Sequence, residues 1–576
     1  MIETICPKCH VPMKGEVCVK ENCKTKTVMS TTLYWCTDCN VPIYEKICPC
    51  CGKEGIYIAT DLRPVFPEER LLLALILEKK SPLFYVDKSV WHGSGAYIVD
   101  GKKVRISVLT INNWPLEKIQ KIKEEYSLWV KQIDDTYFKK NILTFIHANQ
   151  DRFHYINEEA VRFIQSYRDK YPIEDMMVSF SGGKDSTVTS HLVNKALGTN
   201  QVLHVFGDTT LEFPSTIKYK QRFNKNEESQ GVRIVTAKNR EKNFEELCKV
   251  VGPPSRVMRW CCTVFKTGAI QKTIASAFKD KTNILTFYGI RRNESVSRSK
   301  YERESESPKI SKQTVVSPII DWIDFDIWLY ILTTGIDFND AYRLGYARVG
   351  CWCCPNNGAW SEFLSKVYMF EQYSRWRAQL LEFARQVGKP DPEEYIDSGN
   401  WKARQGGNGL VIAQKSIISF EPCATDENAF NYDLQRPITE DLYEFFKPFG
   451  YINKELGNKR LGEVYVLDKS GKVVLILQGR IGNTKLKVTI KKKNIAKARS
   501  LSTAEGKIQC QLTKYQMCLG CKACESVCKH DAISVKDSKD GLVYKIDDEK
   551  CIRCALCVSH FTAGCYMRKI LGIKRG

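Results

Sequence analysis

The chain has 576 residues, 43% of them hydrophobic and 11% aromatic, which is enough for several packed cores. Its longest apolar run, LLLALIL at 71–77, is far shorter than the roughly 18 residues of a bilayer span, so we expect no membrane association. A formal net charge of +21 favours a polyanionic partner such as nucleic acid, with a merely solubilising basic surface as the alternative.

The 25 cysteines are the most unusual feature of the composition. They cluster in C-x-x-C pairs on a large chain, a pattern that favours metal binding over a secreted disulfide scaffold. The N-terminal stretch MIETICPKCH has no apolar signal segment. We therefore expect a cytoplasmic protein with several metal sites.

Residues 1–58 are predicted to be zinc ribbons, because a C-x-x-C turn presents two thiolates to one tetrahedral ion and two such turns complete a closed site. His10 is an alternative ligand in the first set, Cys50 is left over, and unliganded thiols are the alternative for both sets. We expect one or two Zn²⁺ ions. The two sets are Cys6, Cys9, Cys18 and Cys23, and then Cys36, Cys39, Cys48 and Cys51.

Four further regions follow in the pattern of hydrophobic residues. Residues 59–145 predict a small α/β domain, with helices at 67–80 and 115–133 and a hairpin with an Asp-Gly turn at 96–110. Residues 146–400 alternate strands with helices, which predicts a doubly wound parallel sheet within a multidomain α/β protein. The strands are expected at 176–180, 201–208, 232–237 and 283–290.

Residues 401–510 predict a basic α/β module, with a helix at 438–452 and strands at 463–468, 472–478 and 486–490. Residues 451–500 hold 13 Lys or Arg against 3 Asp or Glu, about half of the net charge of the chain. The aromatic residues of 368–386 have helical spacing and are expected to be core residues, with base stacking as the alternative. His204 is expected to be buried in a strand.

The segment VSFSGGKDST at 178–187 places a glycine turn between a strand and a helix. Unpaired backbone N–H groups and the positive end of the helix dipole converge there, which suits a phosphate group. It is not a Walker A loop, because Asp185 follows Lys184 where Ser or Thr is required.

Residues 511–576 predict a bacterial-type ferredoxin with two [4Fe–4S] clusters. In two-cluster ferredoxins the fourth cysteine of each run crosses to the other cluster, which pairs Cys565 with the first triplet and Cys528 with the second. Zinc ligands or free thiols are the alternative. The cysteines are Cys518, Cys521, Cys524 and Cys528, followed by Cys551, Cys554, Cys557 and Cys565.

The central region resembles a known family. Its glycine loop is similar to the S-G-G-x-D-S loop (PP-loop) of N-type ATP pyrophosphatases. Four further motifs are similar to the phosphoadenosine phosphosulfate (PAPS) reductase branch: FGDTTLEFPST at 206–216, RWCC at 259–262, GIRRNESVSR at 289–298 and LGYARVGCWCC at 344–354. The region 59–145 loosely resembles the part that precedes RNA-binding PUA domains.

The resemblance implies roles for individual residues. An adenine nucleotide, with Mg²⁺ for ATP, would be held by Ser181, Gly182, Gly183, Lys184, Asp185 and Ser186, near Asp208 and Thr209, with Arg291, Arg292 and Arg298 as anion-binding arginines. Catalytic roles fall to Lys184, Asp185, Ser186 and Asp208. A third [4Fe–4S] cluster would be held by Cys261, Cys262, Cys351 and Cys354, with metal-free thiols as the alternative. Cys353 is a candidate reactive thiol, and Cys50 and Cys423 have no assigned role.

Two departures from the reductase pattern bear on function. The C-terminal E-C-G-x-H segment is absent, and the glycine loop is complete, which favours cleavage of ATP to AMP and pyrophosphate. We expect adenylation of a substrate for sulfur transfer to tRNA or DNA, with electron-donor and sulfur-donor proteins as partners. The alternatives are a ferredoxin-fused reductase of adenylyl sulfate or PAPS that produces sulfite, and a redox-sensing nucleic-acid binder.

Overall fold

The computed structural model describes residues 3–5, 12–13, 18, 28–228, 233–256, 258–295, 298–306, 313–403, 419–518, 520–538, 541–559 and 574–575. Residues 1–207, 211–237 and 274–374 form a first compact unit, and residues 208–210, 238–273 and 375–576 form a second. Within these described ranges, no helix is both long and apolar enough to cross a membrane. The predicted ligands Cys6, Cys9, Cys23 and Cys565 lie outside the described residues.

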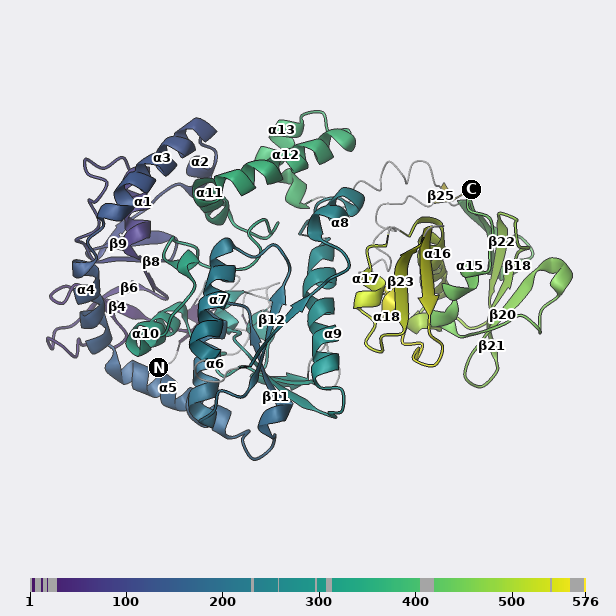
Figure 1. Ribbon diagram of the computed structural model, residues 1–576, viewed down its shortest axis with the longest axis horizontal. Coiled ribbons are helices and arrows are strands. Elements are labelled where there is room, and N and C mark those ends of the chain that lie inside the picture. The colour runs from purple at the N-terminus through teal and green to yellow at the C-terminus, as the bar shows by residue number, and fades with distance from the viewer. Residues whose placement is uncertain are drawn as a thin grey trace. The chain divides into compact units, whose positions relative to one another are not determined.

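Three small antiparallel sheets open the first unit (Figure 1). The first has the order β2-β1-β3, with bounds Pro12–Met13, Glu3–Ile5 and Val28–Ser30, and two others follow it. One has the order β5-β4-β6, with bounds Val41–Ile43, Leu33–Cys36 and Ile56–Ala59. The other has the order β10-β9-β8-β7, with bounds Lys102–Val104, Ala96–Val99, Val90–Gly93 and Arg63–Pro64. Asp100 and Gly101 connect β9 to β10 with φ of 47° and 79°, the conformation that a two-residue Asp-Gly turn requires. The predicted hairpin is confirmed.

Helices surround these sheets. The predicted helices at 67–80 and 115–133 are confirmed as α1 (Pro67–Ile76) and α3 (Leu116–Trp129). α4 (Thr136–His147) and α5 (Gln150–Gln165) follow, and each buries one apolar stripe. In α5 this stripe is Ile156, Ala160 and Ile164, the spacing that places side chains on one helical face.

A six-stranded sheet in the order β13-β12-β11-β14-β16-β15 is the centre of the first unit. β11 (Met176–Phe180) pairs in parallel with β12 (Leu203–Asp208) and β14 (Ile284–Tyr288), and β14 pairs in parallel with β16 (Gln313–Val316). β13 is Ile234–Lys238, and the edge strand β15 (Glu304–Glu306) is antiparallel. All four strands predicted from the sequence are present, and His204 of β12 is fully buried as expected.

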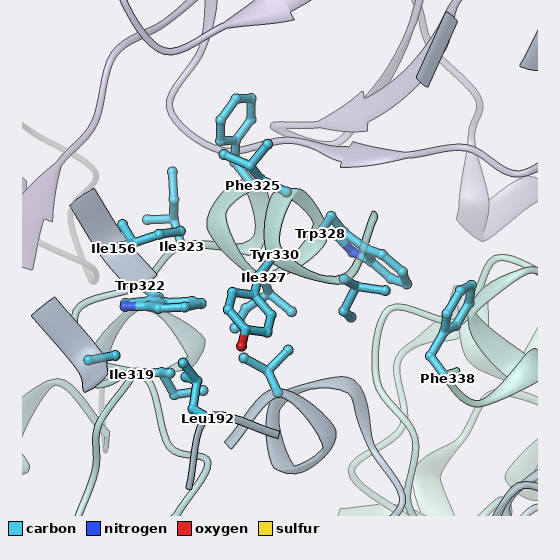
Figure 2. Close-up of a cluster of buried hydrophobic side chains, with 14 of the residues drawn as sticks. Ile156, Leu192, Ile319, Trp322, Ile323, Phe325, Ile327, Trp328, Tyr330 and Phe338 are labelled. Carbon is cyan, nitrogen blue, oxygen red and sulfur yellow. The ribbon is translucent and has the colours of Figure 1, made fainter. Parts of the chain in front are cut away.

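One core joins the N-terminal sheets to the central sheet. Helix α10 (Asp324–Thr334) is buried on nearly all sides, and Figure 2 shows Phe325, Trp328 and Tyr330 extending from it into this core. Phe325 packs against Phe145 of α4 with ring centroids 5.2 Å apart. Residues of 33–66, 138–167 and 319–342 thus share apolar neighbours, so the small domain and the central sheet are packed as one body.

The second unit contains a seven-stranded sheet in the order β19-β20-β21-β22-β18-β17-β25. The three strands predicted here are confirmed as β20 (Glu463–Leu467), β21 (Val473–Gln478) and β22 (Lys485–Ile490). The sequence did not predict β17 (Ser419–Cys423), β18 (Asp426–Asp433), β19 (Tyr451–Asn453) or β25 (Lys574–Arg575).

The predicted helix at 438–452 is wrong. The chain forms only the short α15 (Asp441–Glu444) and a 3₁₀ turn, η8 (Lys447–Phe449), before β19 begins. Pro448 provides the reason, because it lacks an N–H group and disfavours the helical conformation at the residue before it.

Helix α16 (Leu501–Met517) leads into the cysteine-rich end, where α17 (Ala523–Ser526), β23 (Ile533–Ser538), β24 (Gly541–Ile546) and α18 (Leu556–Ser559) follow. These elements share a core with the seven-stranded sheet. The aromatic segment at 368–386 forms α12 (Phe370–Gln386) and buries Trp376 and Phe383, as the prediction of core residues requires.

Candidate active site

The glycine turn lies between the C-terminal end of β11 and the first residue of α6 (Lys184–Leu197) (Figure 1). The hydroxyl of Ser186 donates to the carbonyl of Gly183 at 2.9 Å and accepts from the backbone N–H of Ser181 at 3.2 Å. The side-chain amide of Asn339 donates to the carbonyl of Gly182 at 3.1 Å. These bonds hold the turn open at a helix N-terminus, where backbone N–H groups and the helix dipole attract anions.

Two glycines are required by this geometry. Gly182 has a φ of 70°, and a Cβ there would lie 3.0 Å from Thr216. Gly289, which follows β14 (Ile284–Tyr288), passes so close to α6 that a Cβ would lie 2.7 Å from the carbonyl of Asp185. A side chain at either position would disturb the turn or the first residues of α6.

Buried charges of both signs meet beside the turn. Lys184 is 2% exposed, and its ammonium group lies 3.4 Å from Asp185 and 3.3 Å from Asp324. Arg291 is 4% exposed and donates to Asp185 at 2.5 Å and to Asp324 at 2.6 Å. The two cations and two carboxylates form a closed network at the N-terminus of α6, and we name these four residues the loop charge cluster.

The pKa shifts of the four groups all favour their charged forms. Burial opposes the charge of Asp185, but Arg291 and Lys184 outweigh it and lower its pKa to about 2. Burial also opposes the charge of Lys184, yet Asp185 and Asp324 raise its pKa. The pKa of Arg291 is raised and that of Asp324 is lowered by the same pairs, against burial.

Sequence reasoning missed three residues of this site. Asp324 begins α10, and Asp61 follows β6 in the small domain, where its carboxylate accepts the backbone N–H groups of Asp324 and Phe325 at 3.0 Å each. Burial and the charge of Asp324 raise the pKa of Asp61 to about 7. Tyr342 accepts the N–H of Lys184 at 3.0 Å. None belongs to a recognisable motif, because the tertiary fold brings them to the turn.

The other predicted nucleotide ligands have different surroundings. Arg292 pairs with Asp321 and donates to the carbonyl of Tyr301 at 3.1 Å, and Arg298 pairs with Glu294. Burial, with the nearby charge of Arg348, lowers the pKa of Arg298.

Asp208 and Thr209 belong to the second unit, in which Asp208 lies 3.5 Å from Lys238. Their role beside the nucleotide stays a prediction.

The central cysteine pairs fall in the two units. Cys262 begins the π-helical segment η3 (Cys262–Thr267) in the second unit. In the first unit, the N–H of Cys354 donates to the carbonyl of Cys351 at 3.2 Å, so this C-x-x-C forms a tight turn that suits metal binding. Cys353 is 7% exposed, which does not favour a reactive thiol. A cluster held by the four flanking cysteines stays a prediction.

Four cysteines of the N-terminal sheet form a metal-binding group. The sulfur atoms of Cys36, Cys39, Cys48 and Cys51 all lie within 4.8 Å of one another, with 3.4 Å between Cys36 and Cys51 and 3.7 Å between Cys39 and Cys48. Thiolates bound about 2.3 Å from one tetrahedral ion lie at comparable separations, so this set fits Zn²⁺. Cys50 is exposed and outside the set.

Described cysteines of both C-terminal runs lie near one another. Burial raises the pKa of Cys524, the Lys514 cation opposes the rise, and Cys518, Cys521 and Cys557 add to it. Burial raises the pKa of Cys557 to about 11, with Cys528, Cys551 and Cys554 adding to the effect and the Lys514 cation opposing it. Cys528 therefore lies near the second triplet, the arrangement expected for two clusters with crossed ligands.

A mostly parallel sheet with a glycine turn at a helix N-terminus is typical of α/β domains of the nucleotide-binding class. Comparison with known families then narrows the class of this domain. Residues 175–357 match the phosphoadenosine phosphosulfate reductase domain, and residues 517–560 match the 4Fe-4S dicluster domain. The chain thus joins a PAPS reductase domain to an iron–sulfur ferredoxin domain.

Individual relatives match smaller parts of the chain. An uncharacterized protein of Methanocaldococcus jannaschii is 33% identical over 257 residues, which are 45% of this chain and 51% of the relative. An adenosine 5'-phosphosulfate reductase of Neisseria meningitidis is 34% identical over 98 residues, 17% of this chain and 36% of the relative. A sulfate adenylyltransferase subunit 2 of Methylorubrum populi is 28% identical over 184 residues, 27% of this chain and 55% of the relative. The chain spans only a third to about half of the length of these relatives.

Proposed function

We propose that this chain is a cytoplasmic enzyme that binds ATP at the glycine turn and adenylates a substrate for sulfur transfer to nucleic acid. The observation that carries the proposal is the complete turn with Lys184 and Arg291 buried beside it. These cations suit the phosphates of a nucleotide, and the neighbouring carboxylates offer the oxygen ligands that Mg²⁺ prefers.

The proposed reaction has two steps. An oxygen atom of the substrate attacks the α-phosphorus of ATP, and the bond to pyrophosphate breaks. A sulfur nucleophile at the oxidation level of sulfide then bonds to the activated atom, and AMP leaves with the original oxygen. If the sulfur comes from a persulfide, two electrons must first reduce it. Iron–sulfur clusters held by the C-terminal cysteines would supply electrons one at a time.

We assign binding of the nucleic-acid substrate to the basic module and the N-terminal zinc ribbons. Residues 451–500 carry the densest positive charge in the chain, and the lysines at 491–493 are exposed. Cationic side chains on such a surface displace counterions from nucleic-acid phosphates.

The test is an anaerobic incubation of the reconstituted full chain with α-labelled ATP and Mg²⁺, with and without bulk tRNA or DNA. We expect AMP that requires nucleic acid. Lys184→Ala should lower its formation at least about a hundredfold, because a buried cation beside the reacting phosphates is lost. Lys195→Ala is the matched control on the same helix, since this exposed lysine donates to Asn157 and lies away from the glycine turn.

A second candidate is a ferredoxin-fused reductase of adenylyl sulfate or PAPS, favoured by the name of the Neisseria relative. It predicts sulfite release from these nucleotides and no AMP from ATP, a result that would overturn adenylation. A redox-sensing nucleic-acid binder is the third candidate. It predicts nucleic-acid binding with neither AMP nor sulfite.

A further inference from the structure

A cavity of about 610 Å³ opens in the first unit, and its described lining shares no residue with the glycine turn or the loop charge cluster. It lies between the start of α1, the segment 130–146 with helix α4, and the segment 332–343. Binding sites for small molecules typically measure about 300–1,000 Å³ and are mostly apolar, with a few polar groups that orient the ligand. The cavity falls within this range of size.

One wall of the cavity is aromatic. The ring centroid of Phe66 lies 5.4 Å from that of Phe138 and 5.4 Å from that of Phe338, so the three rings are neighbours. Ile146 and Leu332 also line the cavity and remain partly exposed to solvent. An apolar ligand body placed against these side chains would remove apolar surface from water, which is favourable.

The two cations of the lining each have a carboxylate nearby. The ammonium group of Lys139 lies 2.9 Å from Asp135. The guanidinium group of Arg343 lies over two phenylalanine rings of the wall and 3.9 Å from Asp340, which also pairs with Arg222. The protein itself thus supplies counter-charges to both cations, and the lining does not select for an anionic ligand.

Glu68 is the polar group of the lining that lacks such a partner. It lies in the first turn of α1, and its Oε2 atom is buried with no hydrogen-bond partner among the described residues. Burial raises the pKa of the Glu68 carboxyl, its own backbone N–H and Arg343 oppose the rise, and Asp340 and Asp135 add to it. A buried acceptor without a donor costs free energy, so a ligand that donates to Glu68 would be stabilised.

We propose that this cavity is a binding site, separate from the proposed nucleotide site, for a small molecule that joins an apolar body to a protonated amine. The ammonium group would donate to Oε2 of Glu68, and the body would lie against the wall of Phe66, Phe138 and Phe338. A charged donor is favoured over a neutral one, because hydrogen bonds to ionised groups are the stronger kind. The proposal does not depend on adenylation.

The experiment uses the anaerobic full chain without ATP and measures affinity by ligand-observed NMR titration. The probes are phenethylamine and hexylamine, which carry an ammonium group on an aromatic or an aliphatic body. Phenethyl alcohol is the neutral comparison, and phenylpropionate is the anionic one. We expect both amines to bind saturably and phenylpropionate to bind more weakly than either.

Two variants test the two parts of the site. Glu68→Gln should weaken phenethylamine binding about tenfold, because the charged acceptor is lost, and should leave the binding of phenethyl alcohol nearly unchanged. Leu143 lines the cavity and is 58% exposed, so Leu143→Trp should obstruct the cavity without disturbing the core, and should weaken the amine and the alcohol alike. Glu117→Gln, which removes an exposed carboxylate from α3, is the matched control.

Each outcome decides the proposal. Absence of saturable binding of both amines to the wild type would overturn it. Equal phenethylamine affinity in the wild type and Glu68→Gln, or in the wild type and Leu143→Trp, would also overturn it, because binding would then occur elsewhere. AMP formation from ATP is measured separately, so failure of adenylation leaves the amine site standing.

Discussion

Asp61 belongs to the candidate active site although it lies in no recognisable sequence motif. Its carboxylate accepts two N–H groups at the start of α10, and Asp324 of that helix turn contacts both Lys184 and Arg291. Asp61 therefore fixes the position of Asp324, and through it the two buried cations. A residue of the small domain becomes a positioning residue for the proposed nucleotide site.

We expect Asp61→Asn to change how stability depends on pH. Because the pKa of Asp61 is raised to about 7 from 3.8, the folded chain binds this proton more tightly than the unfolded chain does. The resulting stabilisation is complete below pH 3.8 and is lost as pH rises to about 7. The wild type should therefore lose stability relative to the variant across this window, as measured by anaerobic urea titration at several pH values.

A flat difference between wild type and Asp61→Asn from pH 4 to 7 would contradict the raised pKa of Asp61. The matched control is Asp87→Asn, which removes an exposed carboxylate from the same small domain.

At the scale of elements, the sheet β5-β4-β6 depends on its four cysteines and on Asn149, the residue that precedes α5. Trp35, Val41 and Ile43 are buried in the main core, and Asn149 bridges the sheet by accepting the N–H of Tyr44 at 2.8 Å and donating to the carbonyl of Pro42 at 3.1 Å. A bound ion would add to this packing by joining the two cysteine turns of the sheet.

We expect Cys39→Ser to lower the zinc content by about one ion per chain and to lower the urea midpoint, because the four-thiolate site loses a ligand. Metal analysis measures the zinc content, and the tryptophan fluorescence of the chain follows unfolding in urea. Cys50→Ser, a change to the exposed neighbouring thiol, should alter neither. Equal zinc in Cys39→Ser and wild type would show that these thiols hold no zinc.

At the scale of the whole molecule, the uneven charge is the property most relevant to a partner. The excess of ten positive charges in 451–500 lies in a module whose seven-stranded sheet shares its core with the ferredoxin region. The proposed nucleic-acid-binding module and the ferredoxin region thus share one hydrophobic core. Loss of the charges at 491–493, just after β22, should weaken nucleic-acid binding without loss of the fold, since these lysines are exposed.

We expect duplex DNA binding to weaken steeply with salt. Replacing the three lysines at 491–493 by alanine should reduce the slope of log K against log salt by about 2–3, since each lost phosphate contact contributes about 0.9. Fluorescence anisotropy at several salt concentrations measures the slope. The control removes the same charge at the scattered exposed residues Lys195, Lys279 and Lys389. Equal slopes in the two variants would place the binding surface elsewhere.

Local patterns in the sequence were sufficient for the central strands, the Asp-Gly hairpin, the glycine turn and the Cys36–Cys51 set, because each depends on residues close together in the chain. The prediction of a helix at 438–452 is wrong because Pro448 interrupts a segment whose apolar residues have helical spacing. Asp61, Asp324 and Tyr342 had no local signal, since the site residues that they contact lie 33 to 263 positions away.

The sequence by itself determined the chemistry available to this protein: a phosphate-binding turn, clustered thiolates and a basic module. Only the tertiary structure decided which charges surround the turn and that α17 packs against η3. The physical reason is that motifs record short-range geometry, whereas the loop charge cluster and the packing of α17 on η3 arise when hydrophobic burial packs distant segments together.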